Sequence, residues 1–430
     1  MLRICRLINH LSVYLILSSL LLADVSEAAA QDVAVQQIVT TGRVNSPKQQ
    51  EKPYVILISA DGFRHDYVEK YQANQIKALG EQGVKAEYMT PSFPSLTFPN
   101  HYTLVTGMYP ANHGLIGNNF YDPILERSYS LGDPKTVRDS SWYGGTPLWV
   151  LAEQQDMVTA SLFWVGSEAA IQGVRPSYYY NYTEKITMEE RIQIVMEWLA
   201  LPEEKRPHFI TFYLSEPDHS GHRFGPDASE TKAAVKRVDS TIYALTKAVE
   251  TTGLPVNFIF VSDHGMTSVE RDNPIKVPKI LDADEYVVPA LGALMEVHVK
   301  DKQKVQFLYD SLQNGSDGLY EVYLRRDLPK HLHFNKNTDR FGRIGDIVLV
   351  AKWPRVFSRR STIPGYHGFD PKEVDDMQTI FYAWGPAFKN GLKISSFENI
   401  HVYPLVTQVL GLKHANKIDG KKRVLKKILK

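Results

Sequence analysis

The chain has 430 residues, of which 43% are hydrophobic and 23% charged, and this composition excludes a disordered or fibrous protein. Its 49 lysines and arginines nearly balance 48 aspartates and glutamates, leaving a formal net charge of +1. No global field therefore draws the protein to nucleic acid or to an anionic membrane, and any anion must be bound locally. We expect no stable nucleic-acid partner.

The N-terminus has the pattern of an export signal. Arg3 and Arg6 precede an apolar run over 11–23, and small alanines follow. This pattern predicts a cleaved signal peptide over 1–30. The run is shorter than the roughly 20 apolar residues that span a bilayer, so we expect no membrane anchor after cleavage.

The single cysteine, Cys5, lies within that predicted signal peptide. The mature chain would then contain no disulfide, although many exported animal proteins use them. A domain of this size can be stable without disulfides. We expect an exported protein, periplasmic or secreted, with a bacterial periplasm or exterior as the favoured setting.

Beyond the signal, the chain is predicted to contain one catalytic domain over 53–430. The polar, glutamine-rich stretch 31–52 is typical of a linker or a loosely attached arm. Short strand-like segments over about 273–364 predict a small inserted α+β subdomain. In the basic C-terminal tail, apolar residues from Val424 to Leu429 recur at helical spacing, which favours a docked helix over a nucleic-acid patch.

Three apolar runs have the length and composition of buried strands, beginning at Tyr54, His208 and Asn257. Helical patterns lie between them, from Met188 and from Ser229. Alternation of buried strands with helices predicts an α/β domain around a mainly parallel sheet flanked by helices.

Acidic and imidazole side chains follow each of these predicted strands: Asp61, Asp218, and the pair Asp263 and His264. Ligands of open α/β sheets bind outside the carboxyl ends of the strands. A single Asp after a strand is more often a cap or a turn residue. Several such groups in one crevice would repel or remain unsatisfied unless cations neutralised them.

Two further histidines extend this set. His222 follows Asp218 by one helical turn, which places both side chains on one face, and His367 lies in a glycine-flanked loop. A mixed set of oxygen and nitrogen ligands suits zinc better than magnesium or calcium. We expect two zinc ions per chain, each with an open position for catalysis.

Thr97 is the candidate nucleophile. It precedes Phe98 and Pro99 and a helical pattern that runs to Gly107, so it stands at a helix start. The positive end of a helix dipole favours phosphate, and a metal beside the hydroxyl would favour its alkoxide. The spacing alone leaves open that Thr97 only caps the helix.

Five motifs of the chain resemble those of a known family, the nucleotide pyrophosphatase/phosphodiesterases of the alkaline phosphatase superfamily. The matching segments, in the same order, are ADGFR from Ala60, LTFPNHYTLVTG from Leu96, EPDHSGHRFGP from Glu216, SDHGM from Ser262 and GYHGFD from Gly365. The resemblance extends from Pro53 to the C-terminus and implies the alkaline-phosphatase-like fold.

The resemblance implies the following ligands for the two zinc ions: Asp61, Asp263, His264 and the Thr97 oxygen for the zinc that activates the nucleophile, and Asp218, His222 and His367 for the zinc that stabilises the leaving oxygen.

It also implies substrate contacts. Asn118 falls where the family places an asparagine that hydrogen-bonds a phosphoryl oxygen, and Asn119 is the weaker candidate. Phe98, Trp164 and Tyr182 are expected near the pocket for the nucleoside. Val165 stands where the family often has proline, which affects only the local loop.

The implied reaction is a double in-line displacement. Thr97 attacks phosphorus and expels an ester or anhydride oxygen, and water then hydrolyses the phospho-threonine diester. The expected substrates are nucleotide phosphodiesters and pyrophosphates, which yield nucleoside 5′-monophosphates.

Three alternatives stay open. A lysophospholipid or glycerophosphocholine phosphodiesterase could use the same metal site. An alkaline-type phosphomonoesterase is less favoured, because Leu96 and Phe98 flank the nucleophile where a dianion would call for arginine, and a neutral Asn118 suits a diester. A catalytically inactive binding module would be favoured by the loss of a ligand, and none is lost.

Overall fold

The computed structural model describes residues 35–414 and 416–430. The chain divides after Gln36, and the unit from Gln37 to Lys430 contains all the elements described below. The predicted signal peptide lies outside the described residues. Within the described ranges, no helix is long and apolar enough to cross a membrane.

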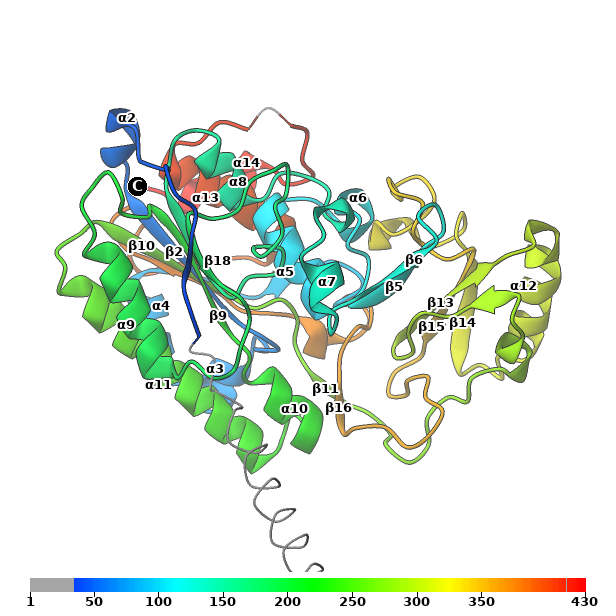
Figure 1. The fold of residues 1–430 in the computed structure, drawn as a ribbon. Coiled ribbons are helices and arrows are strands. Elements are labelled where there is room, and N and C mark those ends of the chain that lie inside the picture. The colour runs from blue at the N-terminus through cyan, green and yellow to red at the C-terminus, as the bar shows by residue number, and fades with distance from the viewer. Residues whose placement is uncertain (1–34, 415) are drawn as a thin grey trace, which may run out of the picture. The chain divides into compact units, whose positions relative to one another are not determined.

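A nine-stranded sheet forms the centre of this unit (Figure 1). Its strands, in spatial order, are β1 (Ile38–Val39), β8 (Tyr178–Tyr180), β7 (Thr159–Leu162), β9 (Phe209–Leu214), β2 (Tyr54–Ala60), β10 (Val256–Val261), β17 (Phe381–Trp384), β3 (Val84–Ala86) and β18 (Leu392–Ile394). The strands from β8 to β10 run parallel. β1 and β17 pair antiparallel with their neighbours.

The three apolar runs of the sequence are β2, β9 and β10, which lie side by side in this sheet. Every residue of β2 is buried, as expected for a strand covered on both faces. Ile56 and Ile58 point into one apolar core and Val55 and Leu57 into the other, because successive strand residues face opposite sides.

Helices cover both faces of the sheet. The first core contains α4 (Asn74–Gln82), α9 (Met188–Leu199) and α11 (Ser229–Glu250), and the second contains α5 (Thr97–Thr106), α8 (Leu148–Glu153) and α13 (Val402–Leu410). The predicted α/β fold with a flanked, mainly parallel sheet is thereby confirmed.

Shorter elements connect these layers. They are α2 (Pro47–Gln50), α3 (Tyr67–Lys70), α6 (Pro110–His113), α7 (Pro134–Val137) and α10 (Asp218–Phe224), with β4 (Met89–Thr90) paired to β19 (Phe397–Glu398), β5 (Asn119–Asp122) to β6 (Arg127–Ser130), and β11 (Thr267–Ser268) to β16 (Gly365–Tyr366).

A smaller antiparallel sheet lies within the segment that the sequence predicts to be an inserted α+β subdomain (Figure 1). Its order is β12 (Tyr286–Val287), β13 (Leu294–Val299), β15 (Ile347–Ala351) and β14 (Tyr320–Leu324). One face packs on α12 (Val305–Asn314). Val348, on the other face, joins the core of α5 and α13, so the insertion is packed on the main domain.

The first and the last segments of the unit from Gln37 to Lys430 pack against the rest of that unit. β1 pairs with β8, and the buried Asn45 donates to the carbonyl oxygens of Glu203 and Arg206, so part of the segment expected as a linker is attached to the domain. The tail contains α14 (Lys422–Leu425) and a 3-10 turn (Lys426–Ile428). Leu425 and Ile428 are buried, as the apolar spacing predicts.

Candidate active site

Three neighbouring strand ends bring the acidic residues together. Asp61 directly follows β2, Asp218 begins α10 after β9, and Asp263 follows β10. Because β9, β2 and β10 are adjacent and parallel, their carboxyl ends meet at one edge of the sheet. All three carboxylates are buried there.

Two glycines allow the backbone to pack tightly at this edge. Gly62 has φ +67°, and a Cβ at that position would lie 3.0 Å from the Cα of Asp218. Gly265, directly after His264, does not have its φ in the left-handed region. Its role is close approach, since a Cβ there would lie 1.9 Å from the carbonyl oxygen of Asp376.

The first group of side chains consists of Asp61, Asp263 and His264, whose potential ligand atoms all lie within 4.8 Å of one another. His264 Nε2 is 3.4 Å from Asp61 Oδ1 and 3.0 Å from Asp263 Oδ2. These are the residues that the resemblance assigns to the nucleophile-activating metal.

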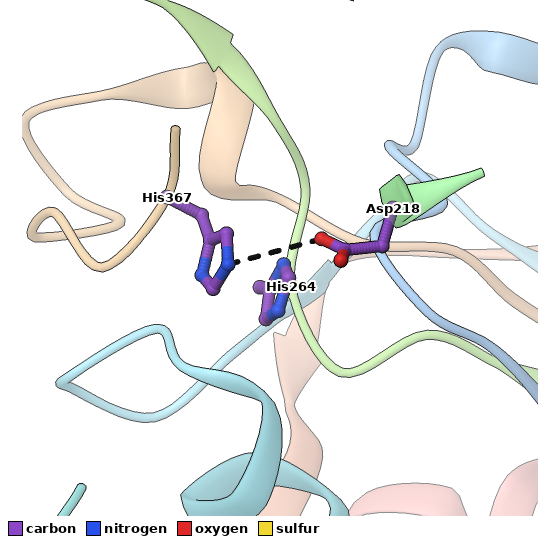
Figure 2. Close-up of side chains that lie close together, drawn as sticks. All are labelled: Asp218, His264 and His367. Atoms are coloured by element: carbon purple, nitrogen blue, oxygen red, sulfur yellow. Dashed lines mark ion pairs between the residues drawn. The ribbon is translucent and has the colours of Figure 1, made fainter. Parts of the chain in front are cut away.

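The second group surrounds Asp218 Oδ1. His222 Nε2 lies 3.4 Å and His367 Nε2 3.8 Å from this oxygen, and the two ring nitrogens are 3.0 Å apart. Figure 2 shows Asp218, His264 and His367 close together. The rings of His264 and His367 stack with centroids 3.5 Å apart, so His264 also lies beside the second group.

Backbone carbonyls orient all three histidines in the same way. The Nδ1–H groups of His222, His264 and His367 donate to the carbonyl oxygens of Gly365, Gly265 and Ser95, each at 2.9 Å. In the neutral ring, Nε2 then carries the free lone pair. This is the arrangement that metal-ligating histidines adopt.

One oxygen of each carboxylate lacks an ordinary hydrogen-bond partner. Asp61 Oδ1, Asp218 Oδ1 and Asp263 Oδ2 are buried and accept no well-oriented hydrogen bond. Burial raises the pKa of Asp61 well above its usual value, and the charges of Asp263 and Asp218 raise that pKa further. Burial alone would raise the pKa of Asp263, but His264 and His101 hold it well below its ordinary value.

These observations fit bound cations. Buried oxygens without hydrogen bonds are costly unless a positive charge neutralises them. Three such oxygens face imidazole nitrogens whose other ring atom is already bonded, and this mixed donor set suits zinc. The structure thus contains candidate metal-binding groups at the edge where the sequence predicts them.

Thr97 is the first residue of α5, and the cap position is taken by Leu96, one residue earlier than the helix start predicted from sequence. No side-chain capping hydrogen bond is made at this helix start. Instead, Thr97 Oγ1 lies 3.1 Å from His264 Nε2. The hydroxyl therefore faces the first group of candidate ligands.

The backbone N–H of Phe98 donates to Asn118 Oδ1 at 2.9 Å. The carbonyl of this amide is thereby engaged beside the start of α5, and its NH₂ group is the part left to donate to a substrate oxygen. Asn119 Oδ1 instead accepts from the hydroxyl of Ser130 within the β5–β6 ribbon.

The three aromatic candidates occupy different environments. Phe98 is half-buried, and its ring meets Tyr129 edge to face. Tyr182 is 49% exposed, and its ring lies edge to face with Tyr213. Trp164 is only 3% exposed and donates from Nε1 to the carbonyl oxygen of His101, so the structure places it beneath the site rather than on its surface.

Sequence reasoning missed two residues that contact the candidate ligands. The Tyr213 hydroxyl donates to Asp61 Oδ2 at 2.7 Å. His101 Nδ1 lies 3.3 Å from Asp263 Oδ2 and 3.0 Å from the carbonyl oxygen of Thr97. His101 stands one helical turn after Thr97, a spacing that marks it as a neighbour of the nucleophile.

A cavity of about 220 Å³ adjoins the site between the main domain and the insertion. Its wall includes Asn118, His222 and His367 from the site and the stretch 289–294 from the insertion. The buried Glu296 of β13 also lines it. The site is therefore open to a ligand.

Comparison with known proteins agrees with this geometry. The sequence model of the type I phosphodiesterase/nucleotide pyrophosphatase family matches residues 55–370, which include every candidate ligand. This chain belongs to that family. The expectation drawn from its motifs is thereby confirmed.

Two named relatives show how similar this chain is in sequence to other proteins. Ectonucleotide pyrophosphatase/phosphodiesterase family member 1 of Rattus norvegicus is 37% identical over 380 residues, covering 85% of this chain and 42% of the relative. The venom phosphodiesterase CdcPDE of Crotalus durissus collilineatus is 36% identical over 404 residues, covering 91% and 48%. The chain spans less than half the length of these relatives.

Solved structures of the family match over their full length. Murine ectonucleotide pyrophosphatase/phosphodiesterase 5 has a TM-score of 0.81 at 30% identity, with 88% of this chain and 100% of that chain covered. An inactive threonine-to-alanine variant of the same murine protein, in complex with AMP, has a TM-score of 0.82.

Proposed function

We propose that this chain hydrolyses nucleotide phosphodiester and pyrophosphate bonds to nucleoside 5′-monophosphates, with Thr97 as nucleophile and two zinc ions as cofactors. The observation that carries the proposal is the Thr97 hydroxyl, which makes no capping bond and lies 3.1 Å from His264 Nε2. Relatives named as nucleotide pyrophosphatases and the AMP complex of a murine relative support the substrate class.

The side chains present divide into two ligand sets. Asp61, Asp263 and His264, with the Thr97 oxygen, would hold one zinc, and Asp218, His222 and His367 the other. Zinc bound there would supply Lewis acidity that favours the alkoxide of the nucleophile and stabilises the leaving oxygen.

The chain's own residues then account for the reaction. Thr97 Oγ1 gives up its proton to water and forms a bond to phosphorus, and the leaving oxygen departs with the electron pair of its bond. The Asn118 NH₂ donates to a phosphoryl oxygen that gains charge in the transition state. Water next attacks the phospho-threonine diester, releases the 5′-monophosphate and returns the proton to the threonine oxygen.

Burial of the site supports such a step. Asp61 and Asp263 are 2% and 0% exposed, so the electrostatic interactions around the reacting atoms are little screened by solvent. Tyr213 and His101 hold these carboxylates in place and act as positioning residues. Trp164 supports His101 in turn.

The exposed Tyr182 and the half-buried Phe98 are the aromatic residues available to a nucleobase. Tyr182 is tied to the Asp61 side of the site through the ring of Tyr213. Neutral groups flank the nucleophile, namely Leu96, Phe98 and Asn118, which favours a diester over a dianionic monoester.

We also propose that the protein is exported, as the N-terminal pattern predicts.

A substrate panel tests the proposal. The purified, zinc-supplied chain is offered nucleotide diesters, dinucleotide pyrophosphates, glycerophosphocholine and phosphate monoesters. We expect the nucleotide substrates to be cleaved fastest, with a nucleoside 5′-monophosphate as product. Faster turnover of glycerophosphocholine would support the lipid alternative, and preference for monoesters would support the phosphatase alternative. No turnover of any of them would support an inactive module.

A further inference from the structure

A second hollow shares His222 with the candidate site. It measures about 410 Å³. The residues around it come from α10, from the loop after β11 and from the segment before β16: His219, His222, Arg223, Arg271, Thr362, Ile363 and Pro364. Among these described lining residues there are two arginines and no acid.

The two guanidinium groups differ from those of nearby arginines. Arg355 pairs with Glu270 at 2.7 Å and Arg359 with Asp282 at 2.9 Å. In the described part of the chain, no carboxylate lies within 4.0 Å of the guanidinium of Arg223 or Arg271. Both arginines are exposed, and their charges remain available to an anion.

The hollow is fixed relative to the reacting groups. Arg223 directly follows His222 in α10, and His222 Nδ1–H donates to the carbonyl oxygen of Gly365 in β16. The N–H of Thr362 donates to the carbonyl oxygen of Arg271 at 3.0 Å. This hydrogen bond joins the loop after β11 to the segment before β16, the two other segments that line the hollow. α10, β11 and β16 lie beside one another in Figure 1.

The position of His222 determines which part of a substrate reaches this hollow. By the proposed ligand sets, the metal held by Asp218, His222 and His367 stabilises the leaving oxygen. A group that departs past His222 meets Arg223 and Arg271. The other cavity next to His222 has no lysine or arginine among its described lining residues, so the arginines of the second hollow are the cationic side chains on this side of the site.

We propose that Arg223 and Arg271 form a subsite for anionic leaving groups, such as the pyrophosphate of a nucleoside triphosphate or the phosphate of a second nucleotide. The inference rests on the proposed function, and it adds that the site favours substrates whose leaving group is anionic. With a formal net charge of +1, the chain has no global field for such anions, so the attraction must come from local cations. Guanidinium groups suit phosphate oxygens because they present several donors in one plane.

The test compares two substrates with the same nucleoside 5′-phosphoryl group. The zinc-loaded full chain cleaves ATP with pyrophosphate as leaving group, and the nitrophenyl ester of AMP with nitrophenolate. In the double variant Arg223→Gln/Arg271→Gln, we expect kcat/KM for ATP to fall about tenfold, as for the loss of two partly screened charge-assisted contacts. The nitrophenyl ester should change by less than about twofold, because it has no leaving-side phosphate.

Three controls accompany the double variant. Arg326→Gln removes the same charge from a side chain that is 66% exposed and outside the hollow, and it should leave both substrates unchanged. The double lysine variant, Arg223→Lys/Arg271→Lys, should keep part of the preference for ATP. The defect on ATP should shrink at high ionic strength, where exposed charges are screened.

The outcomes separate the inference from the function on which it rests. Equal losses on both substrates, or unchanged kcat/KM for ATP, would overturn the arginine subsite while leaving the diesterase proposal in place. A wild-type chain that cleaves neither substrate would overturn both. The single variants Arg223→Gln and Arg271→Gln keep the test valid if the double variant is poorly folded, since each should lose part of the ATP preference.

Discussion

Thr97 connects the local structure of one helix to the proposed chemistry. Threonine is a good N-cap residue, and a hydroxyl engaged in capping would be held by backbone N–H groups. Here Leu96 occupies the cap position and the Thr97 hydroxyl faces His264. The purely structural role that the sequence left open therefore lacks its hydrogen bond.

We expect Thr97→Ala to lower turnover of nucleotide diesters by at least about a thousandfold, the order seen when a nucleophile is removed. Thr97→Ser should retain a substantial part, because the hydroxyl remains. Steady-state rates measure both, and the melting temperature should change little in either variant, since no capping bond is lost. Near-normal rates for the alanine variant would mean that water attacks phosphorus directly.

Tyr182 tests the nucleobase contact. Tyr182→Ala should reduce kcat/KM for nucleotide diesters by about ten- to hundredfold, the range for loss of one base–aromatic stack. A small nitrophenyl phosphate diester without a base should be spared. Tyr243→Ala is the matched control, because Tyr243 is also exposed but lies on α11. If Tyr182→Ala slows both substrates equally, the nucleobase contact is wrong.

The residue types of the site were predictable, but not every neighbour was. Aspartate and histidine at successive strand ends are visible in the sequence because strand ends are marked by the end of apolar runs. Tyr213 lies inside such a run, where an aromatic is expected in any case. His101 and Trp164 meet only through the packing of α5 against the loop after β7, which no local pattern reports.

Among the elements, β2, β9 and β10 were the most predictable. Their residues are buried on both faces, so they form continuous apolar runs. The order of the strands was not predictable, because it depends on contacts between segments far apart in the chain. The adjacency of β9, β2 and β10 is what turns separate motifs into one site.

A buried carboxyl in β13 predicts how the stability of the protein changes with pH. Glu296 lies on the face of this strand opposite the core residues Met295 and Val297. Burial raises its pKa to about 8 from an ordinary value of 4.5. As pH rises between these values, the unfolded state loses a proton that the folded state keeps, so stability falls. The stabilising contribution is complete below about pH 4.5 and is lost by about pH 8.

Replacing Glu296 with glutamine should remove this pH dependence. We expect the melting temperature of Glu296→Gln, relative to the native chain, to be higher at pH 8 than at pH 5. Thermal unfolding followed by circular dichroism measures the difference. Glu321→Gln, at an exposed position of β14, controls for loss of one negative charge. A difference that is the same at both pH values would contradict the assignment.

At the scale of the whole molecule, the sheet, the helix α5 and the insertion converge on a cluster that is unfavourable without cations. Asp61, Asp218 and Asp263 follow the ends of three neighbouring strands, Thr97 begins a helix, and His367 follows the insertion. Buried like charges oppose folding unless they are neutralised. Metal binding is therefore expected to contribute to stability as well as to turnover.

Stepwise addition of zinc to chelator-treated protein, with turnover of a nucleotide diester followed at each step, tests whether two zinc ions are needed for the reaction. The two ligand sets predict that activity is absent without metal and reaches its plateau at about two zinc ions per chain. The melting temperature should rise over the same range. Full activity without added zinc, or a plateau at one ion per chain, would contradict the two-metal account.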